Sequence, residues 1–333
     1  MMRSNRLKPG MLSVFLLLSL AALVGTHTLA QGPAPGGPVR TDIAGDWMAF
    51  DLSAGFQNLA MINSEDQPHR APGPELGDYT GLPINAAVRQ KADAWDATIL
   101  SQPERQPQAH PAQYWMRGPG PNVRILKILD PVTQQTVAYT IAGGFGRADR
   151  VVWMDGRPHP SDYSEHTWDG FSTGAWENGQ LVVTTTHMKQ GVIQRNGVAT
   201  SPYGVMTEHF FRHGVYLTMF FSVDDPIFFE EPMVRTQTWA WAPDSVTAAD
   251  TPFEAVDELG DKPLGWVPFW PLGTEHREFA EVHNLPFKST QGGKESLYPE
   301  YQLKIEEFAR EEAAAKAAPS ATSSSRPSSS TRR

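Results

Sequence analysis

Apolar and polar residues alternate along the middle of the chain, between about residues 122 and 241. The alternation begins loosely near Val123 and becomes regular from Val137 to Ile141. A period of two sends successive side chains to opposite faces, so this pattern predicts β-strands that each bury one face. No helical pattern interrupts the strands, which favours an antiparallel meander over a parallel sheet.

Tight turns divide this region into hairpins. Asn178-Gly179 marks the first turn, because this pair tolerates the positive φ angles that a two-residue hairpin loop requires. His213-Gly214 marks the second, between strands predicted at residues 205–211 and 216–223. A last strand is expected at residues 234–241.

A helical period brackets the strands on both sides. Pro83 suits a first helical turn, and apolar residues spaced for one helix face follow it, which predicts a helix near residues 83–95. Tyr301, Ile305 and Phe308 predict a second helix within residues 297–316. The predicted fold class is therefore mainly β, an antiparallel meander that forms a barrel or a sandwich, with one N-terminal and one C-terminal helix.

The chain begins with the three parts of a secretory signal. Basic residues precede an apolar run over residues 11–24, and small residues end at Ala30, where cleavage is expected. A membrane anchor that is never cleaved is the alternative. The predicted segments are the signal (1–30), a linker (31–41), the β-rich domain (42–250), an irregular extension (251–296), a helix (297–316) and a disordered tail (317–333). The mature protein is expected in the periplasm or outside the cell, without stable membrane insertion.

Charge and cysteine content exclude several classes of protein. The 28 basic and 37 acidic residues give a formal net charge of −9, and no basic stripe is present, so nucleic acid is not an expected partner. The absence of cysteine removes disulfides, thiolate nucleophiles and cysteine-ligated metals. No phosphate loop, dinucleotide glycine pattern or zinc-binding motif occurs, so no cofactor or metal is expected. The oligomeric state stays open.

Two sequence segments carry a family resemblance. Residues 150–160 contain an Asp-Gly-Arg-x-His-Pro element, and residues 174–183 contain a Trp-Glu-x-Gly-x-Leu-Val-Val hairpin. Together they resemble a widespread family of secreted bacterial proteins that has no settled activity, over roughly residues 42–245. The opening Gly45-Asp46-Trp47 also looks like the start of lipocalin-type barrels; the alternative is a tryptophan that fills the core of any β fold.

The first group of candidate catalytic residues lies in the Asp-Gly-Arg element. Asp155, Arg157 and His159 alternate, so in an extended segment their side chains share one side. His159 is then a candidate general base, with Asp155 or another carboxylate fixing its tautomer and Arg157 holding an anionic group. The alternative is an Asp-Gly turn and a proline-rigidified loop, in which Arg157 bridges strands.

The second group lies on the later strands. Glu208 and Arg212 share one strand face and are candidate contacts in a barrel mouth, Glu208 being also a candidate catalytic carboxylate; the alternative is a cross-strand salt bridge. Arg235 and Trp239 share a face of the last strand, and with Trp176 they are candidates for ligand binding. Ordinary core packing is the alternative for the tryptophans.

Two functions follow from these patterns. The first is a soluble exported protein that binds a small, partly apolar organic ligand inside a barrel-like pocket. The second is an exported acid/base enzyme, of hydrolase, lyase or isomerase type, that uses His159 with Asp155, Arg157 or Glu208. The sequence does not identify the ligand or substrate.

Overall fold

The computed structural model describes nine segments of the chain. These are residues 42–49, 76–96, 101, 110–117, 122–143, 150–193, 196–243, 262–263 and 266–317. The predicted signal, the linker and all but the first residue of the predicted tail lie outside them. Within these segments, no helix has the length and apolar character needed to cross a membrane.

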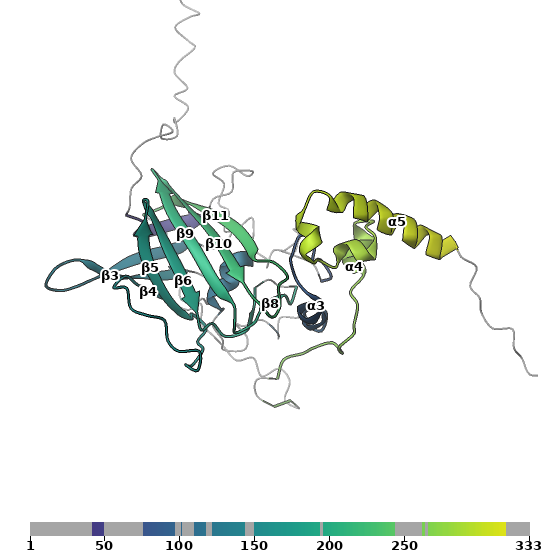
Figure 1. Cartoon of the computed structure of the whole chain (residues 1–333), viewed down its shortest axis with the longest axis horizontal. Helices are drawn as coiled ribbons and strands as arrows, with labels where there is room; N and C mark the ends of the chain where they lie inside the picture. The colour runs from purple at the N-terminus through teal and green to yellow at the C-terminus, as the bar shows by residue number, and fades with distance from the viewer. Residues whose placement is uncertain are drawn as a thin grey trace, which may run out of the picture. The chain divides into compact units, whose positions relative to one another are not determined.

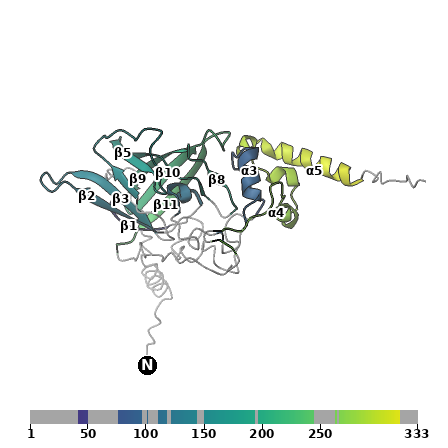
Figure 2. The same ribbon diagram turned by 90° about the horizontal axis from the view of Figure 1, so that it is seen from below.

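The described strands build a closed β-barrel, which confirms the mainly β prediction (Figure 1). Around the barrel the strands follow the order β1-β11-β10-β9-β6-β5-β4-β3-β2. Their bounds are β1 (Gly45–Ala49), β2 (Val123–Leu129), β3 (Thr136–Gly143), β4 (Arg150–Trp153), β5 (Phe171–Glu177), β6 (Gln180–Thr186), β9 (Val205–His213), β10 (Tyr216–Asp224) and β11 (Met233–Trp241). Short strand β1 pairs with both β11 and β2 and so closes the ring (Figure 2).

Two features depart from a simple antiparallel meander. Strands β4 and β5 are parallel, with Val152 opposite Ser172, because the connection over residues 154–170 brings the chain back to the same end of the barrel. A tight turn joins only antiparallel neighbours, so this pair needs its long connection. Strands β7 (Gly191–Val192) and β8 (Ala199–Thr200) form a separate small sheet, and β6 therefore pairs with β9.

The predicted turns occur where the sequence placed them. Asn178 and Gly179 have φ angles of 50° and 81° between β5 and β6. Strands β9 and β10 pair from His213 opposite Tyr216 onward. Beyond β10, the buried carboxylate of Asp225 accepts hydrogen bonds from backbone amides that include those of Ser201 and Phe228. Asp225 therefore terminates the strand and orders the following loop.

Helices pack beside the barrel and join the same core. Helix α3 (Ala86–Asp93) begins after Asn85, whose side chain caps it, so Pro83 lies just before the helix and not in its first turn. Val88 and Ala92 of α3 belong to the core cluster that also contains the barrel's inner residues. The Asn85 amide donates to the carbonyl of Phe228 in the β10–β11 loop, which fixes the start of α3 to the barrel.

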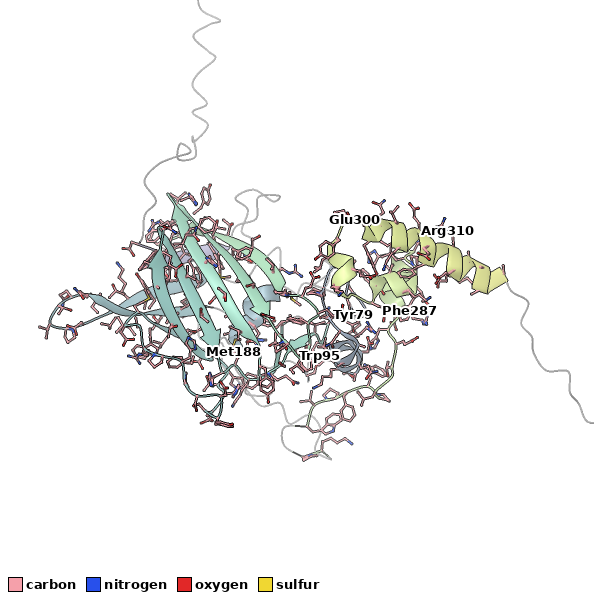
Figure 3. The ribbon with its side chains drawn as sticks, in the orientation of Figure 1. Tyr79, Trp95, Met188, Phe287, Glu300 and Arg310 are labelled. Carbon is pink, nitrogen blue, oxygen red and sulfur yellow. The ribbon has the colours of Figure 1, made fainter. Side chains whose placement is uncertain are left out.

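The stretch predicted as an irregular extension contains helical turns. They are α4 (Glu278–Val282), η4 (Phe287–Thr290) and η5 (Lys294–Leu297), and the predicted C-terminal helix follows as α5 (Tyr301–Ala317). A further 3₁₀ turn, η3 (Ala112–Arg117), precedes β2. Tyr79, labelled beside α3 in Figure 3, donates its backbone amide to Thr290, and its hydroxyl lies 2.6 Å from Asp93 Oδ1. These bonds connect α3 to the C-terminal segment.

Candidate functional site

Two tryptophans and an arginine pack together where β1, β9 and β11 approach one another. The rings of Trp47 and Trp241 meet edge to face at 5.0 Å, and the guanidinium of Arg212 lies 4.9 Å from the first ring and 4.7 Å from the second. Its Nη1 donates to the carbonyl of Asp42, and its Nε donates to that of Gly214. Arg212, predicted as a ligand contact, thus packs against two tryptophans and bonds two backbone carbonyls.

A charged pair crosses the interior of the barrel. Arg150 of β4 and Glu208 of β9 meet through two hydrogen bonds, Nη1 to Oε2 at 2.5 Å and Nη2 to Oε1 at 2.8 Å. Their side chains are 3% and 0% exposed. The strands are not neighbours, so this pair spans the lumen, which differs from the cross-strand bridge considered above.

Hydroxyl groups surround this ion pair. Arg150 Nη1 also donates to Thr185 Oγ1 at 3.1 Å, and Thr185 Oγ1 lies 2.8 Å from Ser172 Oγ. All of these residues are buried. Arg150 was not among the predicted site residues, although its alternation with Val152 in β4 places both on the inner face.

Two arginines of the inner wall keep N–H groups without an acceptor among the described residues. Arg150 Nε, buried, has no hydrogen-bond partner among the residues that the structure describes. Arg235, on the inner face of β11, also donates to no oxygen within the described segments; the nearest charge that favours its protonated form is Asp78, and partial burial lowers its pKa. Arg235 lies opposite Phe221, which itself lies opposite Glu208, so both charged groups occupy one level of the barrel.

The predicted tryptophans lie on the same inner wall. Trp239 is fully buried within the core cluster, opposite Leu217, so its packing is the role considered as an alternative. Trp176 is partly buried and meets Tyr139 edge to face at 6.5 Å. Gln237, between Arg235 and Trp239 on β11, is buried too. The interior thus joins an apolar half to a polar half.

The Asp155 and Arg157 side chains pair with each other on the outside. Arg157 Nε lies 2.9 Å and 3.0 Å from the two carboxylate oxygens of Asp155, and its guanidinium stacks 3.6 Å from the Trp153 ring. The Arg157 contact is the main reason that the pKa of Asp155 falls to about 2. Gly156 turns the backbone at a φ of 72°, so the extended arrangement expected for Asp155, Arg157 and His159 does not form.

His159 is held by threonine hydroxyls and not by Asp155. Its Nδ1 lies 2.7 Å from Thr186 Oγ1 and its Nε2 lies 2.8 Å from Thr173 Oγ1. Thr173 and Thr186 alternate with the inward-facing Ser172 and Thr185, so His159 lies on the outer wall. The structure therefore separates His159 from Glu208, and these two residues do not share one site.

Two adjacent open grooves, which share Arg277, Phe287 and Glu312, lie along α5, far along the chain from these residues. Their volumes are about 550 Å³ and 570 Å³. The first is lined by α4-flanking and α5 residues such as Arg277, Phe287 and Phe308, and the second by residues that include Ala280, Leu285 and Ala313. No predicted site residue lines either groove.

Comparisons with protein-family models, with curated proteins and with solved structures give no significant match to this chain. The resemblance drawn from the Asp-Gly-Arg-x-His-Pro element and the Trp-Glu hairpin therefore stays a prediction. The fold and the geometry alone define this molecule as a closed β-barrel with a charged inner layer.

Proposed function

We propose that the barrel binds a small organic molecule with a partly apolar body and an anionic group, such as a carboxylate. We further propose that the protein does so after export from the cytoplasm, with its signal removed. The observation that carries the binding proposal is the Arg235 guanidinium on the inner wall, for which the described residues offer no hydrogen-bond acceptor, together with the unpaired Nε of Arg150. A buried N–H group such as Arg150 Nε is costly without an acceptor, and the great majority find a partner in native proteins.

The charges of the inner-wall residues indicate that the ligand carries a negative charge. Arg150 and Arg235 carry two positive charges, and Glu208 supplies one negative charge among the described inner-wall residues at this level. Glu208 already makes both of its strong contacts with Arg150. Asp78 places a negative charge near Arg235 but accepts no hydrogen bond from it, so an anionic group beside Arg235 would supply the missing acceptor. A guanidinium is well shaped for a carboxylate.

The apolar part of the ligand has matching neighbours. Phe221 lies directly opposite Arg235, and Trp239, four residues after Arg235, is on the same inner face of β11. Aromatic and aliphatic walls with a few placed polar groups are typical of small-molecule pockets. The arrangement supports an amphipathic organic acid over a fully polar ion such as phosphate.

Native mass spectrometry of the mature protein tests this proposal, with masses compared under native and denaturing conditions. We expect a retained small organic acid, or saturable binding of the fluorescent anion 1-anilinonaphthalene-8-sulfonate by protein stripped of ligand. Arg235→Gln is expected to weaken binding of this dye by roughly tenfold to a hundredfold, because it removes a charged hydrogen bond worth about 1.5–3 kcal/mol.

The matched control is Arg310→Gln, which removes an exposed arginine from α5 (labelled in Figure 3) and is expected to leave dye binding unchanged. Equal affinity of the Arg235→Gln variant and the wild type, both shown to be folded by circular dichroism, would refute the role of Arg235. Failure of the stripped wild type to bind the dye or any organic acid would refute the proposed ligand class.

A further inference from the structure

The outer wall of the barrel carries a second chemical arrangement, independent of the interior. The connection between β4 and β5 places His159 and Ser161 against the hydroxyls at the adjoining ends of β5 and β6. Thr186 Oγ1 lies 2.7 Å from His159 Nδ1 and 2.8 Å from His187 Nδ1. His187 Nε2 lies 2.9 Å from the Ser161 carbonyl oxygen. One continuous chain of hydrogen bonds therefore runs from Thr173 to Ser161.

The Ser161 carbonyl fixes the direction of every proton in this chain. A carbonyl only accepts, so His187 Nε2 carries the hydrogen, and in the neutral imidazole Nδ1 is then the acceptor. The Thr186 hydroxyl donates its single proton to His187 Nδ1, and its oxygen accepts from His159 Nδ1–H. His159 Nε2 consequently carries no hydrogen, and its lone pair accepts a hydrogen bond from the Thr173 hydroxyl.

These hydrogen-bond directions place an unprotonated imidazole nitrogen beside a hydroxyl, which is the arrangement that activates a nucleophile. A hydroxyl is a weak nucleophile until a base takes its proton, and the base needs a third group that holds its tautomer. Here Thr173 is the hydroxyl, His159 is the base, and Thr186 with His187 holds the tautomer. Burial, and to a smaller extent the nearby His187, lower the pKa of His159, so the imidazole is neutral and able to accept a proton at pH 7.

The surroundings indicate which substrates fit. Phe171 meets the His159 ring edge to face at 5.3 Å, and Trp153 is the parallel-strand partner of Thr173. The Arg157 guanidinium stacks on the Trp153 ring and is neutralised by Asp155, so this ion pair adds polar groups without net charge to the patch. Thr173 and His159 are both half-buried, so each keeps part of its surface exposed to solvent beside these aromatic rings.

We propose that Thr173 is the nucleophile of a second site, activated by His159, that takes acyl groups from small carboxylic esters. Thr173 Oγ1 attacks the carbonyl carbon while its proton moves to His159 Nε2. The bond from the carbonyl carbon to the leaving oxygen then breaks, and that oxygen takes the proton from His159. A water molecule then completes the cycle. His159 takes a proton from the water while the water oxygen attacks the acyl carbon of the threonine ester. The bond from that carbon to Thr173 Oγ1 breaks, Oγ1 takes the proton back from His159, and the carboxylic acid is released.

The test uses p-nitrophenyl acetate as the acyl donor and the whole mature protein as the enzyme. We expect a burst of p-nitrophenol close to one equivalent and, after rapid acid quench and proteolysis, one acetyl group on Thr173. Thr173→Ala is expected to abolish the burst, Thr173→Ser to keep it, and His159→Gln to slow it by roughly a hundredfold or more. The burst rate of the wild type is expected to rise with pH as His159 loses its proton.

Thr184→Ala is the matched control, because Thr184 lies directly opposite Thr173 on β6 and is also half-buried. It is expected to react like the wild type. His187→Asn tests the positioning role: the burst rate measured at high pH, where His159 is neutral in both proteins, should fall, whereas loss of the His187 charge alone would only shift the pH midpoint. An acetyl group found on lysines alone, or an undiminished burst from folded Thr173→Ala, overturns the proposal.

Discussion

Arg150 and Glu208 face each other across the barrel interior from strands that are not neighbours, joined by two hydrogen bonds and screened from solvent. The pair links β4 to β9, on opposite sides of β5 and β6. Such a pair contributes little net free energy over an apolar pair of the same volume, but loss of one partner leaves an uncompensated charge in a dry environment.

Glu208→Ala is therefore expected to lower the free energy of unfolding by about 3–5 kcal/mol. The double variant Arg150→Met with Glu208→Leu is expected to lose much less than the single variant. Urea denaturation measures both. Removal of the exposed ion pair between Lys288 and Glu311, through Glu311→Ala, serves as the comparison and should change stability by about 0–1 kcal/mol. Equal losses from the buried and the exposed pair would contradict the buried geometry.

The contacts of Arg212 predict a measurable contribution to the stability of the barrel. Arg212→Ala removes two cation–π contacts and hydrogen bonds to two carbonyl oxygens, and we expect a loss of about 1–3 kcal/mol in the free energy of unfolding. Thermal unfolding followed by tryptophan fluorescence measures it. Arg212→Lys should recover part of the loss, and an unchanged midpoint for Arg212→Ala would contradict the packing over Trp47 and Trp241.

His159 predicts a pH dependence of stability with a defined sign. Its pKa in the folded protein lies below the ordinary value of 6.5, first through burial and then through His187. Below pH 6.5 the unfolded chain therefore binds more protons at this residue, and the free energy of unfolding falls as the pH is lowered from 6.5 toward the folded pKa.

Chemical denaturation between pH 7.5 and pH 5, for the wild type and His159→Gln, checks this expectation by difference, since both proteins share all other titrating groups. The wild type should lose more stability than the variant as the pH falls. A parallel pair of curves over this range would show that His159 is not held in its neutral form.

The hydroxyl of Tyr79 predicts how strongly α3 holds the C-terminal segment. It lies 2.6 Å from the Asp93 carboxylate, and the Asp93 carbonyl accepts a hydrogen bond from His276 Nε2. Burial raises the pKa of Asp93, and the Tyr79 hydrogen bond counteracts that rise. Tyr79→Phe should cost about 1–3 kcal/mol and raise the pKa of Asp93 further.

Hydrogen exchange measures the effect of Tyr79→Phe locally. We expect faster exchange in α3 and in residues 276–291, with the barrel strands little changed. Thr80→Ala, a neighbouring exposed residue, is the control. Uniform acceleration throughout the barrel would instead mean that this contact supports the whole fold.

The strands and their turns were predictable because their signals are local. Asn178-Gly179 specifies a turn through backbone angles alone, and the alternation along β11 already placed Arg235, Gln237 and Trp239 on one face. The parallel pairing of β4 with β5 has no such local signal. It depends on where residues 154–170 lead the chain, which is a property of the whole barrel.

The sites were harder to predict for the same reason. Arg150 and Glu208 are far apart in sequence, and their meeting requires the barrel to be closed. Asp155 is close to His159 in sequence and was therefore predicted as its partner. The turn at Gly156 instead lets Asp155 pair with Arg157. Thr186 and His187 were missed, because only the folded wall brings them to His159.

The parallel pairing of β4 with β5 requires a long connection, and this connection also supplies side chains to the outer wall of the barrel. An ordinary hairpin would leave only a short turn between these strands, whereas the crossover adds a long segment that carries Arg157 and His159 to the outer wall. Both ends of this segment are tied to the barrel, because the Met154 amide bonds the Val137 carbonyl and the Thr167 amide bonds the His187 carbonyl. Substitutions in its middle can therefore alter the outer wall while its anchored ends keep the strands in place.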